Sequence, residues 1–139
     1  MKDPLLPLRV AYVAKLESLG LSVFEEGAVP AEAKKPYVIV STQTTLEDSN
    51  KSDFGHEATT LLDIVTGVPI NQTGGSKDAD LIAGNILINI NSKTEFLISD
   101  NFQSVSLRMG DSHKLTGNTA TERIFRRLIR FEQTIRQIK

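Results

Sequence analysis

Residues 58–68 read Ala58-Thr59-Thr60-Leu61-Leu62-Asp63-Ile64-Val65-Thr66-Gly67-Val68. This stretch is rich in β-branched and apolar side chains, which favour a pleated strand. A second apolar β-type run, Pro36 to Val40, precedes it, and proline is tolerated at the first position of a strand. Residues 58–68 are long enough to pair with that run and to extend beyond it, so we predict an antiparallel hairpin.

The segment between these two runs is polar. Threonines extend the first run through residues 41–45, and Leu46 to Glu57 then supplies the Asp, Ser, Asn and Gly residues that are typical of turns. We predict that Leu46 to Glu57 forms a long hairpin loop.

Two segments have helical periodicity. The first lies near the N-terminus, ends at Gly20, and places its apolar residues on one face; Pro7 is acceptable there only within the first turn. The second runs from Lys77 to Asn91, with Ser76 as a plausible N-cap. The residues predicted to face the core are Leu5, Leu8, Tyr12, Leu16 and Leu19 in the first helix, and Ala79, Ile82, Ala83, Ile86, Leu87 and Ile90 in the second.

The remaining segments complete a sheet. Leu21 to Phe24 is a candidate short strand, Val105 to Met109 alternates as a strand does, and Gly110 to Asn118 has the composition of a polar turn. Residues 122–138 fit both a helix and a long strand, and we favour the strand because it would complete the sheet. The predicted fold is therefore a single α/β (α+β) domain over residues 1–139, with a mainly antiparallel sheet of about four strands, an N-terminal helix and a central helix.

Composition narrows the classes of function. The chain has 139 residues, no cysteine and a formal net charge of -1. Thiolate chemistry, disulfides and cysteine-bound metals are thus excluded, and nothing indicates a general attraction to nucleic acid or to an anionic membrane. No apolar run approaches the roughly 20 residues that span a bilayer. The N-terminus lacks the apolar core of a signal peptide, so we expect a reducing cytoplasm as the site of synthesis.

The order of these segments resembles the tail terminator, or tail completion, proteins of long-tailed bacteriophages. The resemblance is carried by the N-terminal helix, the Ala33-Lys34-Lys35-Pro36-Tyr37-Val38-Ile39-Val40 strand region, the long strand after its loop, the Lys77 to Asn91 helix and the long C-terminal segment. It implies a non-enzymatic virion protein, assembled in the host cytoplasm, that forms a ring, usually of six subunits. Such a ring caps the tail tube, ends tail polymerisation and meets the head connector. DNA would pass through its lumen without sequence-specific binding, and no cofactor or membrane is implied.

The C-terminal segment is the one basic element of the chain. Its arginines lie beside apolar residues, a composition common at interfaces because guanidinium groups form bidentate ion pairs and stack on rings. Solvated arginines on an amphipathic element are the alternative. The candidate interface residues are Asp48, Asp53, His56, Arg123, Arg126, Arg127 and Arg130.

Enzymatic interpretations remain as alternatives. His56 beside Glu57, with Asp48 and Asp53 nearby, could serve a small metal-dependent hydrolase, although the spacing matches no metal motif and a solvated loop is the simpler interpretation. The sequence Gly74-Gly75-Ser76-Lys77 before a helix lacks the spacing of a phosphate-binding loop.

A head-closure or neck protein is the second candidate within the virion class, and a cellular adaptor is a third possibility. The expected site therefore contains no catalytic, cofactor-binding or metal-ligating residues.

Overall fold

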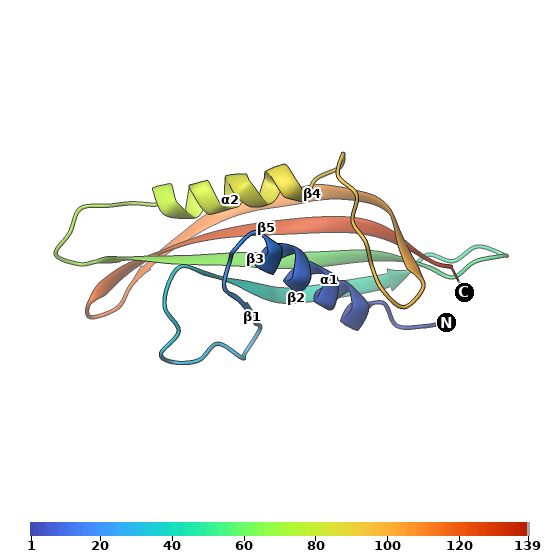
Figure 1. The fold of residues 1–139 in the computed structure, drawn as a ribbon, viewed down its shortest axis with the longest axis horizontal. Coiled ribbons are helices and arrows are strands. Elements are labelled where there is room, and N and C mark those ends of the chain that lie inside the picture. Colours follow the sequence, from blue (N-terminus) through green and yellow to red (C-terminus); the bar gives the residue numbers. More distant parts are fainter. Residues whose placement is uncertain (139) are drawn as a thin grey trace.

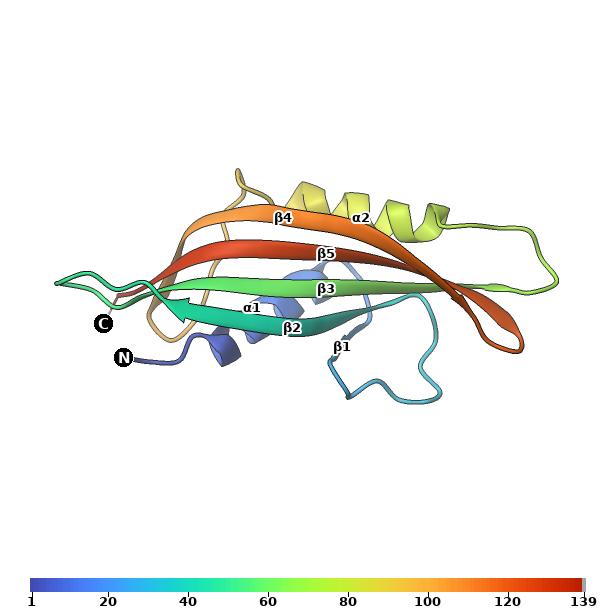
Figure 2. The ribbon, with the colours of Figure 1, turned by 180° about the vertical axis from the view of Figure 1, so that it is seen from behind.

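The computed structural model describes residues 1–138, in which helices lie on a β-sheet. The elements in chain order are α1 (Leu5–Ser18), β1 (Val23–Glu25), β2 (Tyr37–Glu47), β3 (Gly55–Pro69), α2 (Lys77–Asn89), β4 (Phe102–Asn118) and β5 (Glu122–Gln137). The strands form one five-stranded sheet in the order β1-β2-β3-β5-β4. Both helices lie over the same face of the sheet (Figure 1), and the view from behind shows the opposite face without a helix (Figure 2).

The sheet is antiparallel except at one edge. β2 pairs with β3, β3 with β5, and β5 with β4, all antiparallel, whereas the three residues of β1 pair parallel to Val38–Val40. The predicted α+β class, hairpin and two helices are confirmed, and the sheet has five strands rather than about four.

The C-terminal segment is a strand, as we favoured, and it lies inside the sheet between β3 and β4. β5 pairs along its length with β3 on one side and with β4 on the other. Its apolar residues also have helical spacing, but an extended β5 can form backbone hydrogen bonds with a strand on each side. Every second side chain of the strand still reaches the core. Ile129, Phe131 and Ile135 are fully buried on the helix side of the sheet.

One predicted loop is shorter than expected, and the other is part of a strand. β2 continues to Glu47 and β3 begins at Gly55, so the turn covers residues 48–54 rather than Leu46 to Glu57. Gly110 to Asn118 is not a turn, because β4 continues through it to Asn118. Most side chains in both stretches are exposed, which explains their polar composition. Turns have a similar composition, so composition alone does not distinguish these strands from turns. Gly110 lies at an irregularity of the β4–β5 register, where an added Cβ would approach Glu132 to 2.8 Å.

The helix boundaries agree closely with the sequence. α1 starts at Leu5 with Pro7 in its first turn, and Gly20 follows its end with a φ of 81°, a backbone angle that glycine adopts without strain. Ser76 occupies the N-cap position of α2 but makes no side-chain capping hydrogen bond. The buried residues of the two helices are Leu8, Tyr12, Leu16, Ala79, Ala83 and Ile86.

The core between the helices and the sheet contains one prominent polar contact. The fully buried Tyr12 hydroxyl donates a hydrogen bond of 2.6 Å to Oε1 of buried Gln133, whose amide donates in turn to Ser104 at 3.1 Å. Burial raises the pKa of Tyr12, so its hydroxyl stays protonated and remains a donor. The ring of Tyr12 also packs on Phe96, with centroids 4.7 Å apart.

We expect Tyr12→Phe to lower the free energy of unfolding by about 1–3 kcal/mol, because it leaves a buried amide oxygen without its donor. Chemical denaturation followed by circular dichroism measures this loss. Tyr37→Phe is the matched control: its hydroxyl donates no hydrogen bond within residues 1–138, and we expect a change within about 0.5 kcal/mol. Equal losses in the two variants would contradict a structural role for the Tyr12–Gln133 bond.

Candidate interface surfaces

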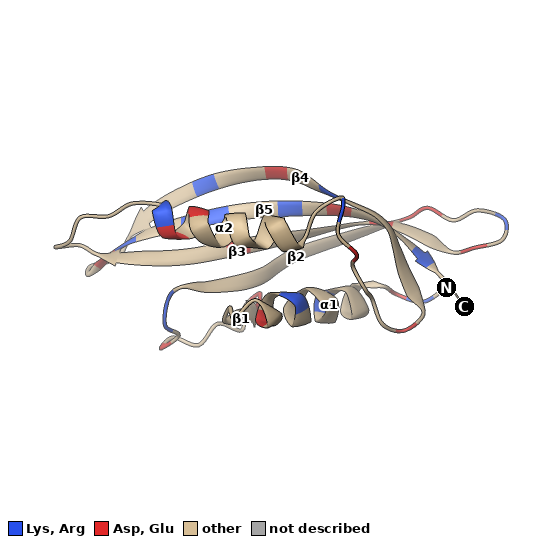
Figure 3. Cartoon of the chain, turned by 45° about the horizontal axis from the view of Figure 1, so that its top comes forward, with Lys and Arg blue, Asp and Glu red and all other residues tan. Residues whose placement is uncertain are grey.

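The arginines of β5 divide between the two faces of the sheet. Because neighbours on a strand point in opposite directions, Arg126 and Arg130 share the face without helices, while Arg123 and Arg127 lie on the helix side. Burial confirms this assignment, since Ile129 and Phe131 belong to the core packed under the helices. Charged residues of both signs lie along β4 and β5 (Figure 3).

On the open face, Arg126 forms a bidentate ion pair with Asp63 of β3. Nε donates to Oδ1 at 3.1 Å and Nη2 donates to Oδ2. The side chain of Asp63 is only 5% exposed, whereas that of Arg126 is 41% exposed. The hydrogen bond to Asp63 raises the pKa of Arg126 above its ordinary value. This pair therefore neutralises a carboxylate that is otherwise removed from water.

On the helix side, Asp80 links α2 to the sheet. It accepts hydrogen bonds from Arg127 of β5 and Lys114 of β4, each at 2.9 Å. The hydrogen bond from Lys114 is the largest effect that lowers the pKa of Asp80, and Arg127 adds to it. Ser112 also accepts a hydrogen bond from Arg127 at 2.7 Å. Arg127 therefore has intrachain partners, and reversing its charge would disturb α2 as well as any contact with another subunit.

The other basic residues of β5 also have partners in the chain. Arg130 pairs with Asp111 at 3.1 Å on the open face, and Arg123 donates to the carbonyl of Gln72. Arg136 donates to the backbone carbonyl of Asp48 at 2.7 Å. These contacts tie the basic strand to its neighbours along most of its length.

Asp48 and Asp53 flank the turn between β2 and β3, at the end of the molecule where the two termini also lie (Figure 1). The turn is ordered by its own hydrogen bonds: the Asn50 side chain accepts the Ser52 and Asp53 amides at 2.9 and 2.8 Å. Both aspartates are exposed and available to a partner.

His56 does not belong to this loop. It lies in β3, is 4% exposed, and its Nδ1 is 3.2 Å from the Thr45 hydroxyl. Its Nε2 is buried without a hydrogen-bond partner among residues 1–138. The interpretation of His56 as part of a solvated loop was therefore wrong, because the strand begins earlier than its polar sequence indicated.

Within residues 1–138, no three His, Asp or Glu side chains are grouped so that they could hold a metal ion. No helix in the same range is long and apolar enough to cross a membrane. His113, Asp111 and Ser112 are consecutive residues of β4, so their side chains alternate between faces and form no triad.

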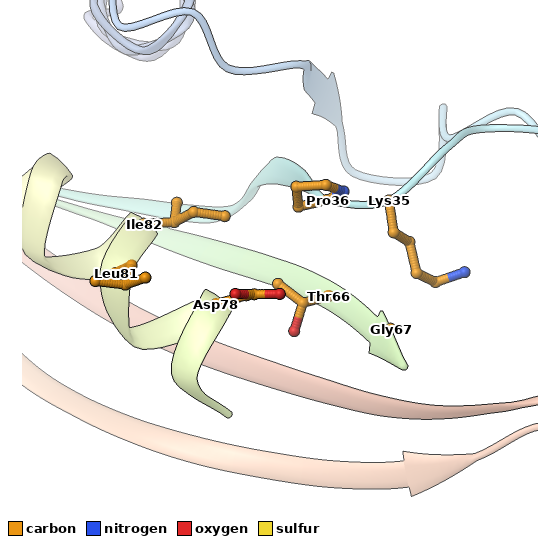
Figure 4. Close-up of a pocket in the computed structure, with 7 residues that line it drawn as sticks. All are labelled: Lys35, Pro36, Thr66, Gly67, Asp78, Leu81 and Ile82. Carbon is orange, nitrogen blue, oxygen red and sulfur yellow. The ribbon is translucent and has the colours of Figure 1, made fainter. Parts of the chain in front are cut away.

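A cavity of about 290 Å³ lies between α2 and the ends of β2 and β3 (Figure 4). Its one ammonium group, on Lys35, is paired with Glu122 at 3.2 Å. The cavity lining is mainly apolar and comprises Lys35, Pro36, Thr66, Gly67, Asp78, Leu81 and Ile82. The lining thus offers mainly apolar contact area.

Sequence reasoning missed the two carboxylates that hold the arginines. Asp63 carried a usable signal, since an isolated carboxylate inside an apolar strand needs a cationic partner. Asp80 carried none, because aspartate in the first turn of a helix is ordinarily explained by the helix dipole.

The arrangement of helices, sheet and charged faces can be compared with known proteins. No protein-family model matches the chain, and no curated protein matches it. A chain from the virion of a native gene transfer agent particle has the same fold, with a TM-score of 0.60, 18% sequence identity, and coverage of 93% of this chain and 90% of that chain. A second solved structure, which carries no functional description, has a TM-score of 0.55 at 10% identity and covers 91% and 93%. The chain therefore shares its fold, over nearly its whole length, with a component of a virion particle.

We expect Arg126→Ala to lower the free energy of unfolding by about 1–3 kcal/mol, because it leaves the buried Asp63 carboxylate without its charge partner. Arg130→Ala is the matched control on the same strand and face. Its partner Asp111 is 59% exposed, so we expect a loss of about 0–1 kcal/mol. Urea denaturation of the three proteins at neutral pH measures both. An Arg126→Ala protein as stable as Arg130→Ala would show that Asp63 is rehydrated at little cost.

Proposed function

We propose that this protein is a virion structural component of the tail terminator type. It assembles into a homo-oligomeric ring, expected to be a hexamer, that caps the tail tube, ends tail polymerisation and offers the surface for head joining. The observation that carries this proposal is the whole-length fold match to a chain of a gene transfer agent virion. The order of segments that resembles tail terminators in the sequence supports the same role, which is structural and non-enzymatic.

The shape of the domain supports a protein that contacts partners at two ends. The β2–β3 turn projects at one end, and the β4–β5 hairpin and the β3–α2 connection project at the other (Figure 1). A ring between a tube and a connector needs surfaces on two opposite sides. Asp48 and Asp53 are the candidate contact residues at the first end. Arg126 and Arg130 are those of the open face, each presenting a guanidinium that is already paired with an acid.

A head-closure or neck protein is the second candidate, because the fold match names a virion particle and no position within it. Removing the gene from a particle that encodes this protein would distinguish the two roles. Without a terminator, tails vary in length, whereas without a head-closure protein, tails have normal length and filled heads lose DNA.

We expect the purified protein to form a ring. Light scattering over a range of concentrations should give about six times the 15.3 kDa chain mass, and negative-stain images should show a central hole. A protein that stays monomeric at all concentrations, both alone and with purified tail tubes, would contradict the proposal.

Shortening the β2–β3 turn tests the joining surface. Replacing residues 49–54 by Asn-Gly keeps Asp48 opposite Gly55, as in the β2–β3 register, and supplies a dipeptide suited to a two-residue hairpin turn. We expect a folded protein of unchanged oligomeric state that produces heads and tails but fails to join them, as seen by electron microscopy of lysates. An Asp53→Asn protein, which keeps the loop length, is the control for folding. Normal infectious particles from the shortened protein would exclude this turn as a joining surface.

A further inference from the structure

The sheet ends in two edges whose backbone groups have no partner within the described chain. On one side, β1 covers only Val38–Val40, so β2 is free from Ser41 to Glu47. On the other side, β4 pairs with β5 alone, apart from a single bridge between Leu97 and Gln103 at its start. Free edges of this length normally pair with another strand or are blocked, and neither free stretch contains proline.

The two free edges lie at the same level of the sheet. The register can be followed from strand to strand: Thr44 is opposite Thr59, Thr59 is opposite Glu132, and Glu132 is opposite Arg108. Leu46 is connected in the same way to Ser106, through Glu57 and Thr134. Residues 44–46 of β2 and 106–108 of β4 therefore occupy the same rows on opposite sides of one subunit.

Strand direction permits the two edges to pair between copies. Three successive antiparallel pairings separate β2 from β4, so β2 and β4 run in opposite directions. A second copy in the same orientation therefore presents its β2 antiparallel to β4 of the first. The same contact can be repeated from copy to copy, which is the heterologous arrangement that closes into a ring.

The charges of the two edges are opposite. β4 carries Arg108 and Lys114 against a single acid, Asp111, whereas the free part of β2 carries Glu47 and no cation. Glu26 adds negative charge beside β2, since its amide donates to Val40 and its carboxylate accepts from Ser41. Two β4 edges would bring cations together, whereas β4 against β2 brings opposite charges together.

Exposed apolar side chains line the same edges. Leu46 is 71% exposed on β2, and Val105 and Met109 are 58% and 43% exposed on β4. The side chain of Arg108 is 71% exposed although it pairs with Glu132 at 2.9 Å. Pairing would remove these groups from water together with the free backbone groups.

We propose that the occupant of each free edge is a second copy of this chain, with β4 of one subunit pairing antiparallel with residues 41–47 of β2 of the next. This joint rests on the proposed ring and identifies the surface that builds it. It makes one continuous sheet around the assembly, with all helices on the same side of that sheet.

Because the chain contains no cysteine, introduced cysteines give an unambiguous test. Single variants are prepared with cysteine at Thr44 or Leu46 of β2 and at Ser106 or Arg108 of β4, all on the face without helices. Directly opposed residues of an antiparallel pair have Cβ atoms about 4.5–5.5 Å apart, close to the separation that a disulfide bridges. We expect mild oxidation to give covalent dimers in at least one mixture of a β2 variant with a β4 variant, and in neither variant alone. A protein carrying both cysteines of that pair should form a ladder that ends at the ring.

Two controls define the result. Thr45→Cys is adjacent to Thr44 but lies on the helix side, and Ile88→Cys is exposed on α2; neither should cross-link to the β4 variants. A β4 variant that cross-links to itself would overturn the joint in favour of a two-fold contact. A ring seen by light scattering without any cross-link between β2 and β4 variants would overturn the joint and leave the proposed function standing. A protein that remains monomeric at all concentrations, both alone and with purified tail tubes, would overturn both.

Discussion

Both helices pack on one face of a single sheet, so the hydrophobic core lies on that side only (Figure 1). This one-sided core determines which side chains of the strands are buried and which are exposed. Ile64, Ile86 and Ile129 are fully buried between the helices and the sheet. The opposite face has no helix layer, so its side chains must be compatible with water or with another molecule (Figure 2). Its charged residues are consequently arranged in ion pairs, of which Arg126–Asp63 is the most buried.

The sequence predicted the elements well wherever one face of an element is buried. The periodicities of α1 and α2 and the alternation of β3 all arise from burial against the same core, and each element was identified. Prediction failed at Leu46 and at residues 110–118, where most side chains of the strand are exposed to water. No burial pattern is imposed there, so such a strand cannot be distinguished from a loop by composition.

The candidate residues illustrate a different limit. Arg126 and Arg127 were identified as members of a basic strand, but their partners lie 63 and 47 positions away in the chain. Only the tertiary register brings these groups together, and it turns an apparent basic patch into a set of intrachain ion pairs. Burial of His56 follows from the same register, which places it beside Ile135 in the interior of the sheet rather than in a loop.

The position of β5 between β3 and β4 also has a consequence for biosynthesis. β3 can pair with β2 once both are made, but the other edge of β3 and the inner edge of β4 await residues 122–137, because β3 and β4 do not pair with each other. Until then the nascent chain exposes a free edge of β3 and an unpaired β4, a state prone to aggregation. Folding must therefore be largely post-translational and, because its contacts join distant residues, slow for a domain of this size. Deletion of residues 122–137 would remove the strand that joins β4 to the rest of the sheet.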